Sequence, residues 1–363
     1  MDRRKVLVIR LSAVGDVIRT LPAVKALKEK EPSSHIAWVV EEHSKSFVES
    51  QPEIDEVILF PRKRWTKGIQ SPLTWWRTSR EVRDFAKGLR QKRFDVALDF
   101  HGRLKSGLIS FASGAPTRVG FDPRSSKEGN FLFSNVKVQL PTEDINRYER
   151  NLLLLRGIGL EITDLKPVLH IPTEERKWAD VFFGQLSSPF LGPLIAIHPW
   201  TSPQTPYKRW VGDRYSQLAD RLVRELGATI IFTWGPGELE PVEKIRREMK
   251  EPSFLAPQTD SLIRLGEIFR RCNLYIGGDT GPMHVASLVG TPIVAIWGPT
   301  HPVVNEPFGK HKMVRKEVGC NPCRRQFCKE VTCLTSVTVE DVFQAARELL
   351  SVGSAGEGIA SQG

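Results

Sequence analysis

The sequence predicts an α/β protein made of two doubly wound domains, each a parallel sheet between layers of helices. Short apolar runs rich in Val, Ile and Phe alternate with amphipathic runs of helical spacing, which is the pattern of β-α-β units. This alternation stops near the middle of the chain and then starts again. A chain of 363 residues is long enough for two such domains.

Four segments of the first half are expected to be buried strands, because they are short, apolar and rich in β-branched and aromatic residues. They are residues 5–11 (KVLVIRL), 35–40 (HIAWVV), 56–60 (EVILF) and 94–100 (FDVALDF). Apolar residues recur at helical spacing in the intervening segments 20–32 and 79–93. The first half is therefore predicted to form one parallel sheet.

The second half is expected to repeat this order of elements. Its predicted strands are residues 192–200, 228–235, 273–281 and 291–300. Helices are predicted at 259–272 and at 215–227, where Gly227 is a stop signal.

The boundary between the domains is predicted from a cluster of Pro and Ser residues at 166–193, which indicates a connecting segment. We place an N-terminal domain at 1–170 and a C-terminal domain at 171–350. Residues 351–363 are rich in Gly and Ser, and are expected to be a disordered tail.

The composition is that of a soluble globular protein, with 40% hydrophobic and 26% charged residues. No apolar run is long enough to span a bilayer. The basic start resembles a signal peptide, but Arg10 interrupts its apolar run and a cleavage site is lacking, so the cytoplasm is expected.

The net charge of +10 comes from one block of the chain. Between Arg62 and Arg150 there are 19 Lys and Arg residues against 9 Asp and Glu residues. Such a block favours an anionic partner, which could be nucleic acid, a membrane surface or an acidic substrate.

An aspartate occupies an unusual place in the first predicted strand-to-helix turn. The turn reads S-A-V-G-D, without the glycine pattern of a dinucleotide site, and Asp16 stands where a phosphate would be bound. Two interpretations remain open. Asp16 could cap the helix that follows, which the Gly-Asp pair alone favours, or it could present a carboxylate for general base catalysis at the edge of the sheet.

The segment 273–300 predicts a phosphate site. A strand ends at Gly277-Gly278, and Asp279-Thr280-Gly281 form a turn before Pro282, which suits the first position of a helix. The unpaired N–H groups at such a helix start bind phosphate, and His284 could add a donor. The alternative is an ordinary turn and helix cap.

Taken together, these motifs resemble the lipopolysaccharide heptosyltransferases of glycosyltransferase family nine, and within them heptosyltransferase I. The resemblance rests on DTGPMHVASLVGTPIVAIWGPT, on IRLSAVGDVIRTLPAVKAL, on FDVALDFHGRLKSGLIS and on HPWTSPQTPYKRW, in order from about residue 5 to about residue 350. It implies a GT-B fold, two Rossmann-like domains facing a cleft. It also implies ADP-heptose as donor, the Kdo (3-deoxy-octulosonate) of inner-core lipopolysaccharide (Kdo-lipid A) as acceptor, inversion at the anomeric carbon and no required metal or other cofactor.

The same resemblance assigns roles to particular residues. Asp16 is expected to be the general base, and Lys208 to stabilise the departing ADP. The expected donor-binding residues are Thr201, Ser202, Lys208, Glu238 (with Glu240 as a rival), Asp279, Thr280, Gly281 and His284. The expected acceptor-binding residues are Arg62, Arg64, Lys105, Arg124 and Arg150.

The expected setting is a monomer in the cytoplasm, associated peripherally with the inner face of the cytoplasmic membrane, where Trp65, Trp75 and Trp76 could meet a sugar or the interface. Four cysteines form the pattern C-x2-C-x4-C-x4-C, which could hold structural zinc or an iron–sulfur cluster or remain as free thiols. They are Cys320, Cys323, Cys328 and Cys333; Cys272 is expected in the core.

Other functions are kept as alternatives. A nucleic-acid-binding protein would suit the charge, but the sequence has no helix-turn-helix, zinc-finger or aromatic RNA-binding signature, so no nucleic-acid partner is expected. A non-catalytic binder of nucleotide sugars or lipid A would not need both Asp16 and Lys208. A relative that modifies a later core sugar, or uses another nucleotide-sugar donor, remains open.

Overall fold

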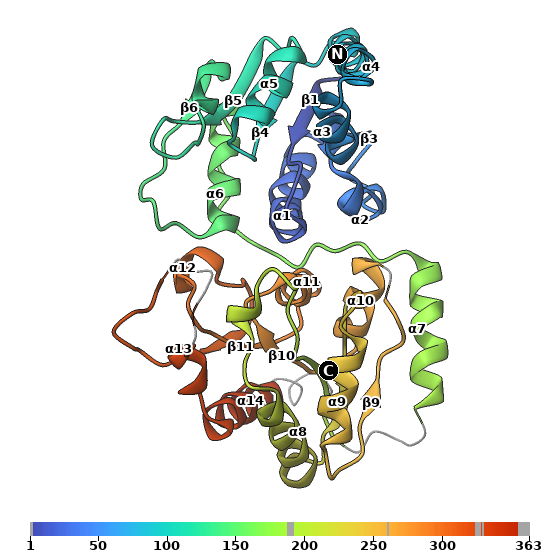
Figure 1. The fold of residues 1–363 in the computed structure, drawn as a ribbon, viewed down its shortest axis with the longest axis vertical. Helices are drawn as coiled ribbons and strands as arrows, with labels where there is room; N and C mark the ends of the chain where they lie inside the picture. Colours follow the sequence, from blue (N-terminus) through green and yellow to red (C-terminus); the bar gives the residue numbers. More distant parts are fainter. Residues whose placement is uncertain (1–2, 187–191, 260, 324–327, 329, 355–363) are drawn as a thin grey trace, which may run out of the picture. The chain divides into compact units, whose positions relative to one another are not determined.

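The computed structural model describes residues 3–186, 192–259, 261–323, 328 and 330–354. The chain divides into two compact units, Met1–Asp164 and Leu165–Gly363, and each is described by itself (Figure 1). Residues Val168 and Leu169 donate backbone hydrogen bonds to Leu288, which ties the start of the second unit to its own core.

The N-terminal unit is built on a six-stranded parallel sheet in the order β3-β2-β1-β4-β5-β6. This is the doubly wound order, in which the chain leaves from the middle of the sheet in one direction and later in the other. The strands are β1 (Lys5–Ile9), β2 (His35–Val40), β3 (Glu56–Leu59), β4 (Val96–Asp99), β5 (Thr117–Phe121) and β6 (Val136–Val138).

Helices cover both faces of this sheet (Figure 1). Leu7 and Ile9 of β1 pack with Leu89 and Ile109 from the α4 and α5 side. Since side chains of a strand alternate between its faces, the intervening residues of β1 point to the other side, where α1 and α6 pack together. The helices are α1 (Val14–Lys30), η1 (Glu42–Ser44), α2 (Lys45–Glu49), α3 (Arg62–Gln70), α4 (Trp75–Gln91), α5 (Leu104–Ala112), η2 (Asn130–Phe133), α6 (Arg147–Leu154) and η3 (Leu155–Ile158).

The C-terminal unit repeats the same topology. Its parallel sheet has the order β12-β11-β10-β7-β8-β9, which is again the doubly wound order when its strands are counted from β7. The strands are β7 (Leu194–His198), β8 (Thr229–Phe232), β9 (Phe254–Leu255), β10 (Leu274–Gly278), β11 (Ile293–Ile296) and β12 (His311–Val314).

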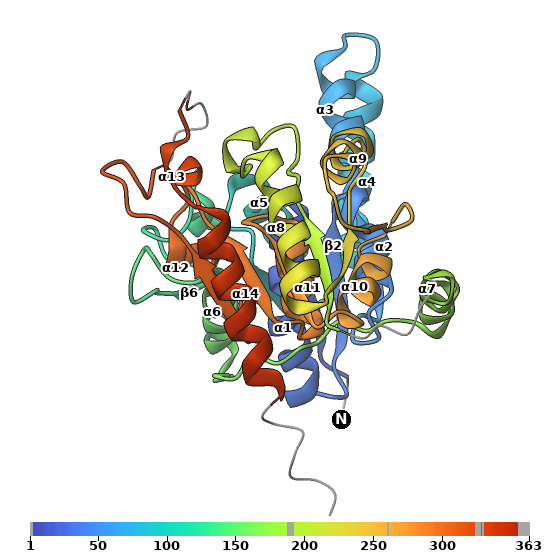
Figure 2. The same cartoon turned by 90° about the horizontal axis from the view of Figure 1, so that it is seen from below.

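One face of this second sheet is covered by α8, α9 and α14, of which α8 and α14 lie side by side (Figure 2). On the other side α10 packs against both α11 and α7. The helices are α7 (Thr173–Gln185), η4 (Pro206–Lys208), α8 (Gly212–Leu226), α9 (Leu239–Arg247), α10 (Leu262–Arg270), α11 (Gly281–Val289), α12 (Pro302–Asn305), α13 (Thr332–Thr335) and α14 (Val339–Ser354).

The predicted α/β class with two doubly wound units is confirmed, and Gly227 ends α8 in the left-handed conformation, with φ of 61°. Two local predictions were wrong. The segment 166–193 contains α7, which ion pairs hold on α10 and the residue after it: Arg264 with Glu175 and Arg271 with Asp180. Helix α14 continues to Ser354, into the predicted tail; the rest of that tail, 355–363, lies outside the described residues.

No helix in the described part of the chain is both long and apolar enough to cross a bilayer.

Candidate functional site

Several of the predicted functional residues lie at the point in each sheet where the direction of winding reverses. In the N-terminal unit this point lies between the neighbouring strands β1 and β4, and in the C-terminal unit between β7 and β10. Loops at the carboxyl ends of such strand pairs form the usual ligand crevice of open α/β sheets. Asp16 follows β1, whereas Asp279 follows β10.

Three arginines surround the carboxylate of Asp16. The Oδ2 atom of Asp16 lies 2.6 Å from Nη2 of Arg10, while Oδ1 receives Nη2 of Arg19 at 2.5 Å and Nη1 of Arg147 at 2.9 Å. Arg10 follows β1, Arg19 lies one helical turn beyond Asp16, and Arg147 opens α6. Sequence reasoning missed all three; only the i,i+3 spacing of Asp16 and Arg19 could have indicated a pair.

The arginines determine the ionisation of Asp16. Burial acts to raise the pKa of this carboxyl, but Arg10, Arg19 and Arg147 outweigh it and hold the pKa well below its usual range. The capping interpretation does not hold, because Ala13 is the N-cap residue of α1 and Asp16 lies in the first turn. Asp16 is therefore ionised near neutral pH, and its oxygens face cations.

A buried polar network lies beside Asp16, at the end of β4. Asp99 accepts hydrogen bonds from Ser106 (2.8 Å), from Nδ2 of Asn130 (2.7 Å) and from the backbone N–H groups of residues 101 and 102. Burial raises its pKa despite these bonds. Burial, together with Arg10 and Lys105, lowers the pKa of the neighbouring His101 to about 3, so its imidazole is neutral near pH 7.

His101 has a second unusual property. Both of its ring nitrogens are buried and have no hydrogen-bond partner in the structure. A neutral imidazole offers one donor and one acceptor, and buried polar atoms are almost always paired in native proteins. His101 is thus a candidate ligand contact that the sequence did not reveal.

A cavity of about 510 Å³ opens on the other side of the Asp16 loop. It is lined by the residues after β1, by Glu41 and its neighbours after β2, and by the start of α3. Glu41 accepts from Nζ of Lys105 at 3.0 Å and lies 3.7 Å from Nη1 of Arg62. The structure therefore brings together Arg62 and Lys105, two of the predicted acceptor residues.

The other predicted acceptor residues are not gathered in this way. Arg64 is exposed and pairs with Glu81, and Arg124 is exposed on the loop after β5. The guanidinium of Arg150 lies 3.5 Å from the centroid of the Phe121 ring. Burial, with Arg10 and Arg147 nearby, lowers the pKa of Arg150 to about 9. Arg150 is half-buried and also donates to the backbone carbonyl of Ser125 at 3.1 Å, so its contacts in the structure lie within the unit and its binding of an acceptor stays a prediction.

In the C-terminal unit, Asp279 joins three loops. Its Oδ2 atom lies 2.7 Å from Nζ of Lys208, 2.8 Å from Oγ1 of Thr300 and 3.2 Å from Nδ2 of Asn305. Lys208 also donates to the backbone carbonyl of Asp279 at 3.2 Å. An ammonium group has three N–H donors. Lys208 can therefore donate to a phosphate oxygen while it keeps both hydrogen bonds to Asp279.

The start of α11 leaves room for a ligand next to this pair. Thr280 is the N-cap residue and its side chain makes no capping hydrogen bond. A Cβ atom added to Gly281 would meet nothing within 4 Å, so the backbone is open to close approach there. The side chain of His284 is only 1% exposed. Contact between this buried side chain and a diphosphate stays a prediction.

The remaining predicted donor residues lie on the loops after β7 and β8. Thr201 is buried and accepts from Nε of Arg209 at 2.9 Å, whereas Ser202 is exposed. Glu238 is buried and accepts from the N–H of Gly235 at 2.7 Å, and its Oε2 lies 3.4 Å from Nε2 of His198. Burial acts to raise the pKa of Glu238, but His198 and the Gly235 N–H lower it overall.

Glu240, the alternative to Glu238 as a donor-binding residue, is exposed in the first turn of α9. Of the two, only Glu238 is fixed at the edge of the sheet.

The four clustered cysteines are free thiols, of which Cys333 is buried and Cys320 and Cys328 are exposed. Burial raises the pKa of Cys333, and its three cysteine neighbours add to this effect. Among the described residues no group of three or more His, Cys, Asp or Glu side chains could hold a metal ion. Residues 324–327 and 329, between the cysteines, lie outside the description, so the suggested zinc or iron–sulfur site stays a prediction.

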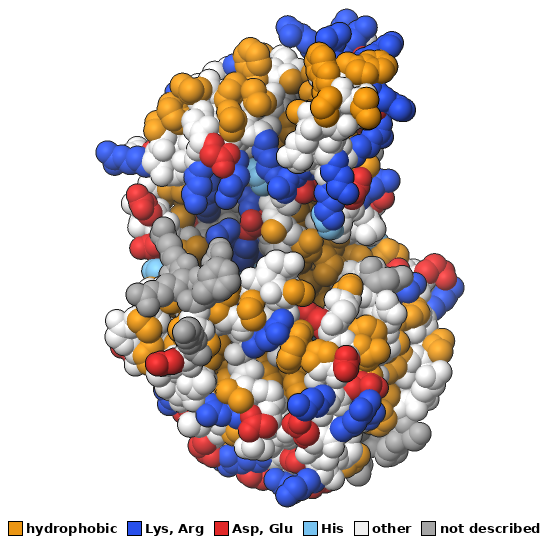
Figure 3. All heavy atoms as spheres, in the orientation of Figure 1, with side chains coloured by type: hydrophobic (Ala, Val, Ile, Leu, Met, Phe, Trp, Pro, Cys, Tyr) orange, Lys and Arg blue, Asp and Glu red, His pale blue; other side chains and the backbone are white. Residues whose placement is uncertain are grey.

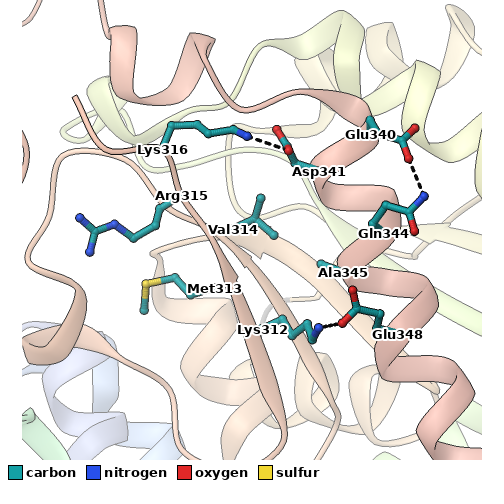
Figure 4. A pocket seen from close by; sticks show the side chains of 10 residues that line it. All are labelled: Lys312, Met313, Val314, Arg315, Lys316, Glu340, Asp341, Gln344, Ala345 and Glu348. Atoms are coloured by element: carbon teal, nitrogen blue, oxygen red, sulfur yellow. Dashed lines mark hydrogen bonds and ion pairs between the residues drawn. The ribbon is translucent and has the colours of Figure 1, made fainter.

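A further depression lies between β12 and α14 (Figure 4). Most of its polar side chains are paired with one another: Lys316 with Asp341, Lys312 with Glu348, and Gln344 with Glu340. Arg315 lies 3.6 Å from Glu317, which is not part of the lining. A polar lining satisfied in this way has little to offer a ligand, so the two switch points remain the candidate site.

Comparisons with known proteins show the family of the chain. The family model for glycosyltransferase family 9 (heptosyltransferase) matches residues 82–333. Lipopolysaccharide core heptosyltransferase OpsX of Haemophilus influenzae is 27% identical over 304 residues, covering 83% of this chain and 81% of that protein. Lipopolysaccharide heptosyltransferase 1 of Pseudomonas aeruginosa is 25% identical over 355 residues, covering 95% and 92%.

Solved structures resemble the whole chain. A glycosyl transferase family 9 protein from Veillonella parvula has a TM-score of 0.77 and 26% identity, covering 97% of this chain and 98% of that one. The E. coli heptosyltransferase WaaC with ADP has a TM-score of 0.73 and 22% identity, covering 95% and 99%, which supports the fold. Because the family model covers more than half of the chain, this protein belongs to glycosyltransferase family 9 (heptosyltransferase), and it is a glycosyltransferase with the GT-B fold.

Proposed function

We propose that this enzyme transfers L-glycero-D-manno-heptose from ADP-heptose to the Kdo of Kdo-lipid A, with inversion at the anomeric carbon and without a catalytic metal. The observation that carries the proposal is the pairing of two different sites. One switch point holds an ionised carboxylate among cations, and the other holds Lys208 beside the open N-terminus of a helix. The cations around the carboxylate suit an anionic acceptor, whereas Lys208 and the helix N-terminus suit the diphosphate of the donor.

The proposed reaction is a single displacement. A hydroxyl oxygen of the acceptor attacks the anomeric carbon of heptose, and its proton passes to a carboxylate oxygen of Asp16. The bond from the anomeric carbon to the diphosphate oxygen breaks, and ADP leaves with the electron pair. Lys208 and the first N–H groups of α11 stabilise the charge that develops on the leaving oxygen.

The acceptor is proposed to bind in the N-terminal unit because the positive charge lies there. Arg62 and Lys105 line the region beside the Asp16 loop, and their shared partner Glu41 fixes their positions. Arginine suits carboxylates and phosphates, and Kdo-lipid A carries both. Lys and Arg side chains are plentiful on this unit (Figure 3).

Peripheral binding to the inner face of the cytoplasmic membrane is also proposed, through the turn between α3 and α4. Leu73 is 84% exposed there, and Ile69, Trp75 and Trp76 are also exposed. Residues 62–93 carry eleven Lys and Arg residues against two acidic ones. Exposed aromatic and aliphatic groups among cations suit the surface of an anionic bilayer.

Trp65 does not belong to this exposed group. It packs between Phe60 and Phe85, with ring centroids 5.1 and 5.3 Å away. Its role is to hold α3 against α4.

The function is tested by measuring ADP release from ADP-heptose with Kdo-lipid A, with heptosylated core, and without acceptor. We expect release that depends on Kdo-lipid A and falls at least about 100-fold in Asp16→Asn, the usual weight of a general base. Asp55→Asn is the matched control, because Asp55 is also ion-paired in this unit but precedes β3. Preference for heptosylated core would assign a later step, and binding of ADP-heptose without transfer would indicate a binding protein.

The membrane proposal has its own test, the sedimentation of the protein with vesicles. We expect binding to phosphatidylglycerol vesicles, little binding to phosphatidylcholine vesicles, and loss of binding in Leu73→Ser/Trp76→Ser. Val181→Ser is the control, since Val181 is 64% exposed on α7 of the other unit. Equal sedimentation of both variants would refute the role of the α3–α4 turn.

A further inference from the structure

We propose that Arg147 is an exchangeable partner of Asp16: the anionic group of the acceptor takes its guanidinium, and this exchange frees Oδ1 of Asp16 to accept the proton of the attacking hydroxyl. The inference rests on the proposed function and adds a device by which the enzyme responds to the charge of its acceptor. In this view Arg147 is a positioning residue for the base.

The three arginines around Asp16 differ in their freedom to move. The side chains of Arg10 and Arg19 are 8% and 10% exposed, whereas that of Arg147 is 41% exposed. Arg10 is also held by the backbone carbonyl of Phe100. Only Arg147 of the three can turn into solvent, or toward a ligand, without opening the core.

The lone pairs of the carboxylate explain why this arginine matters. Each carboxylate oxygen can accept about two hydrogen bonds. The Oδ1 atom of Asp16 already receives Nη2 of Arg19 and Nη1 of Arg147. A hydroxyl group can therefore bond to Oδ1 in good geometry only if one donor leaves, and the exposed donor is Arg147. The other oxygen, Oδ2, receives Nη2 of Arg10, whose side chain is only 8% exposed, so we take Oδ1, the oxygen shared with the exposed arginine, as the proton acceptor.

The cluster also carries an excess of positive charge. Three guanidinium groups around one carboxylate leave a charge of +2. Two other acidic groups at this edge are already engaged, Asp99 by Ser106 and Asn130, and Glu41 by Lys105. An anion arriving beside Arg147 would reduce this excess.

The position of Arg147 in its helix supports the exchange. Arg147 is the first residue of α6, after the cap Asn146. A cation in the first turn of a helix is disfavoured by the helix dipole, so α6 itself does little to hold the Arg147 charge in place. Asp16 holds it in the free enzyme, and a second anion can compete for it.

The consequence for catalysis follows from general base theory. A carboxylate held by three cations is a weak base, because efficient bases have a pKa nearer the working pH. Removal of one cation moves the pKa of Asp16 upward. Acceptor binding would then both vacate the proton-accepting atom and strengthen it as a base.

The test compares two acceptors that differ only in charge, a Kdo glycoside with a free carboxylate and its methyl ester, in the wild type, Arg147→Ala and Arg147→Lys. Arg156→Ala is the control, because Arg156 is an exposed arginine just beyond α6. We expect the wild type to prefer the carboxylate in kcat/KM, and this preference to fall at least about tenfold in Arg147→Ala. Arg147→Lys should keep part of it, and the control should keep all of it.

A binding measurement supports the kinetic one and does not depend on turnover. In Asp16→Asn, Arg147 no longer has to leave a charged partner, so calorimetry should show the carboxylate glycoside binding roughly 1.5- to fivefold tighter than in the wild type, the range of a partly exposed ion pair. Asp16→Asn/Arg147→Ala should lose this gain. Equal losses on both acceptors in Arg147→Ala, or no tighter binding in Asp16→Asn, would overturn the exchange. A wild type that transfers heptose to neither acceptor would instead refute the proposed function.

Discussion

The substitution Asp16→Asn should destabilise the N-terminal unit as well as remove the proposed base. Asparagine keeps the size of the side chain but leaves Arg10 and Arg19, which are about nine-tenths buried, without a counter-charge. Breaking a buried ion pair from one side usually costs about 3–5 kcal/mol. Arg147 is more exposed and can turn to water, so the loss of its ion pair adds little to the loss of stability. We therefore expect the free energy of unfolding to fall by about 3–5 kcal/mol, a large share of the usual 5–15 kcal/mol.

The assay is urea unfolding at pH 7 followed by tryptophan fluorescence and circular dichroism, with Asp55→Asn as the exposed ion-pair control at about 1 kcal/mol or less. A second variant isolates the cause. In Asp16→Asn/Arg19→Met the uncompensated charge of Arg19 is gone, so part of the lost stability should return as a coupling energy. A loss below about 1 kcal/mol in Asp16→Asn, or no recovery in the double variant, would refute the view that the arginines depend on this carboxylate.

Three further predictions concern other residues. His101 should make the free energy of unfolding depend on pH. The histidine binds a proton below about pH 6.5 in the unfolded state, but only near pH 3 in the folded state. Between these two values the unfolded state binds more protons, so the free energy of unfolding decreases as the pH is lowered. Between pH 7 and pH 5 the loss should be about 2 kcal/mol, from about 1.5 pH units at 1.36 kcal/mol each, and urea unfolding of His101→Gln should lack it. Lys208→Met should weaken ADP binding at least about tenfold in calorimetry, with exposed Lys177→Met unchanged. Arg62→Ala should raise the KM for the acceptor severalfold and leave that for ADP-heptose unchanged; equal rises would remove Arg62 from the acceptor site.

Much of the fold could be predicted because it depends on local patterns. A buried parallel strand is a short apolar run, as in residues 35–40, and an amphipathic helix repeats every 3.6 residues, so both leave a signal within a few residues. Strands β5, β6, β9 and β12 were not predicted. Strands β6 and β9 have only three and two residues, and the short segments of β5 (TRVGF) and β12 (HKMV) each include a basic residue in place of a continuous apolar run. Helix α7 was missed because the Pro and Ser residues around it resemble a linker, although Pro172 before the helix and Glu174 in its first turn are ordinary start signals.

The candidate site was predictable only in part, for a physical reason. Residues that follow strands β1, β7 and β10 could be expected at the sheet edges, because the topology of a doubly wound sheet fixes where loops meet. Contacts across long sequence separations could not. Arg147 lies 131 residues from Asp16, and nothing near either residue indicates the other. Burial was also invisible in the sequence: nothing near His284 indicates that its side chain is only 1% exposed.

The two units share a sheet order, yet their switch points have opposite chemistry, and this difference argues for a division of labour. In the C-terminal unit the acidic Asp279 accepts from Lys208, Thr300 and Asn305, so one carboxylate organises neutral and cationic donors around a place open to the backbone at Gly281. A diphosphate that leaves with extra charge needs such fixed donors. In the N-terminal unit the carboxylate is itself surrounded by cations, one of them exposed. That arrangement is poor for a resting base but suits one that should act only when an anionic acceptor is in place, because activation before the acceptor arrives would favour attack by water on the donor.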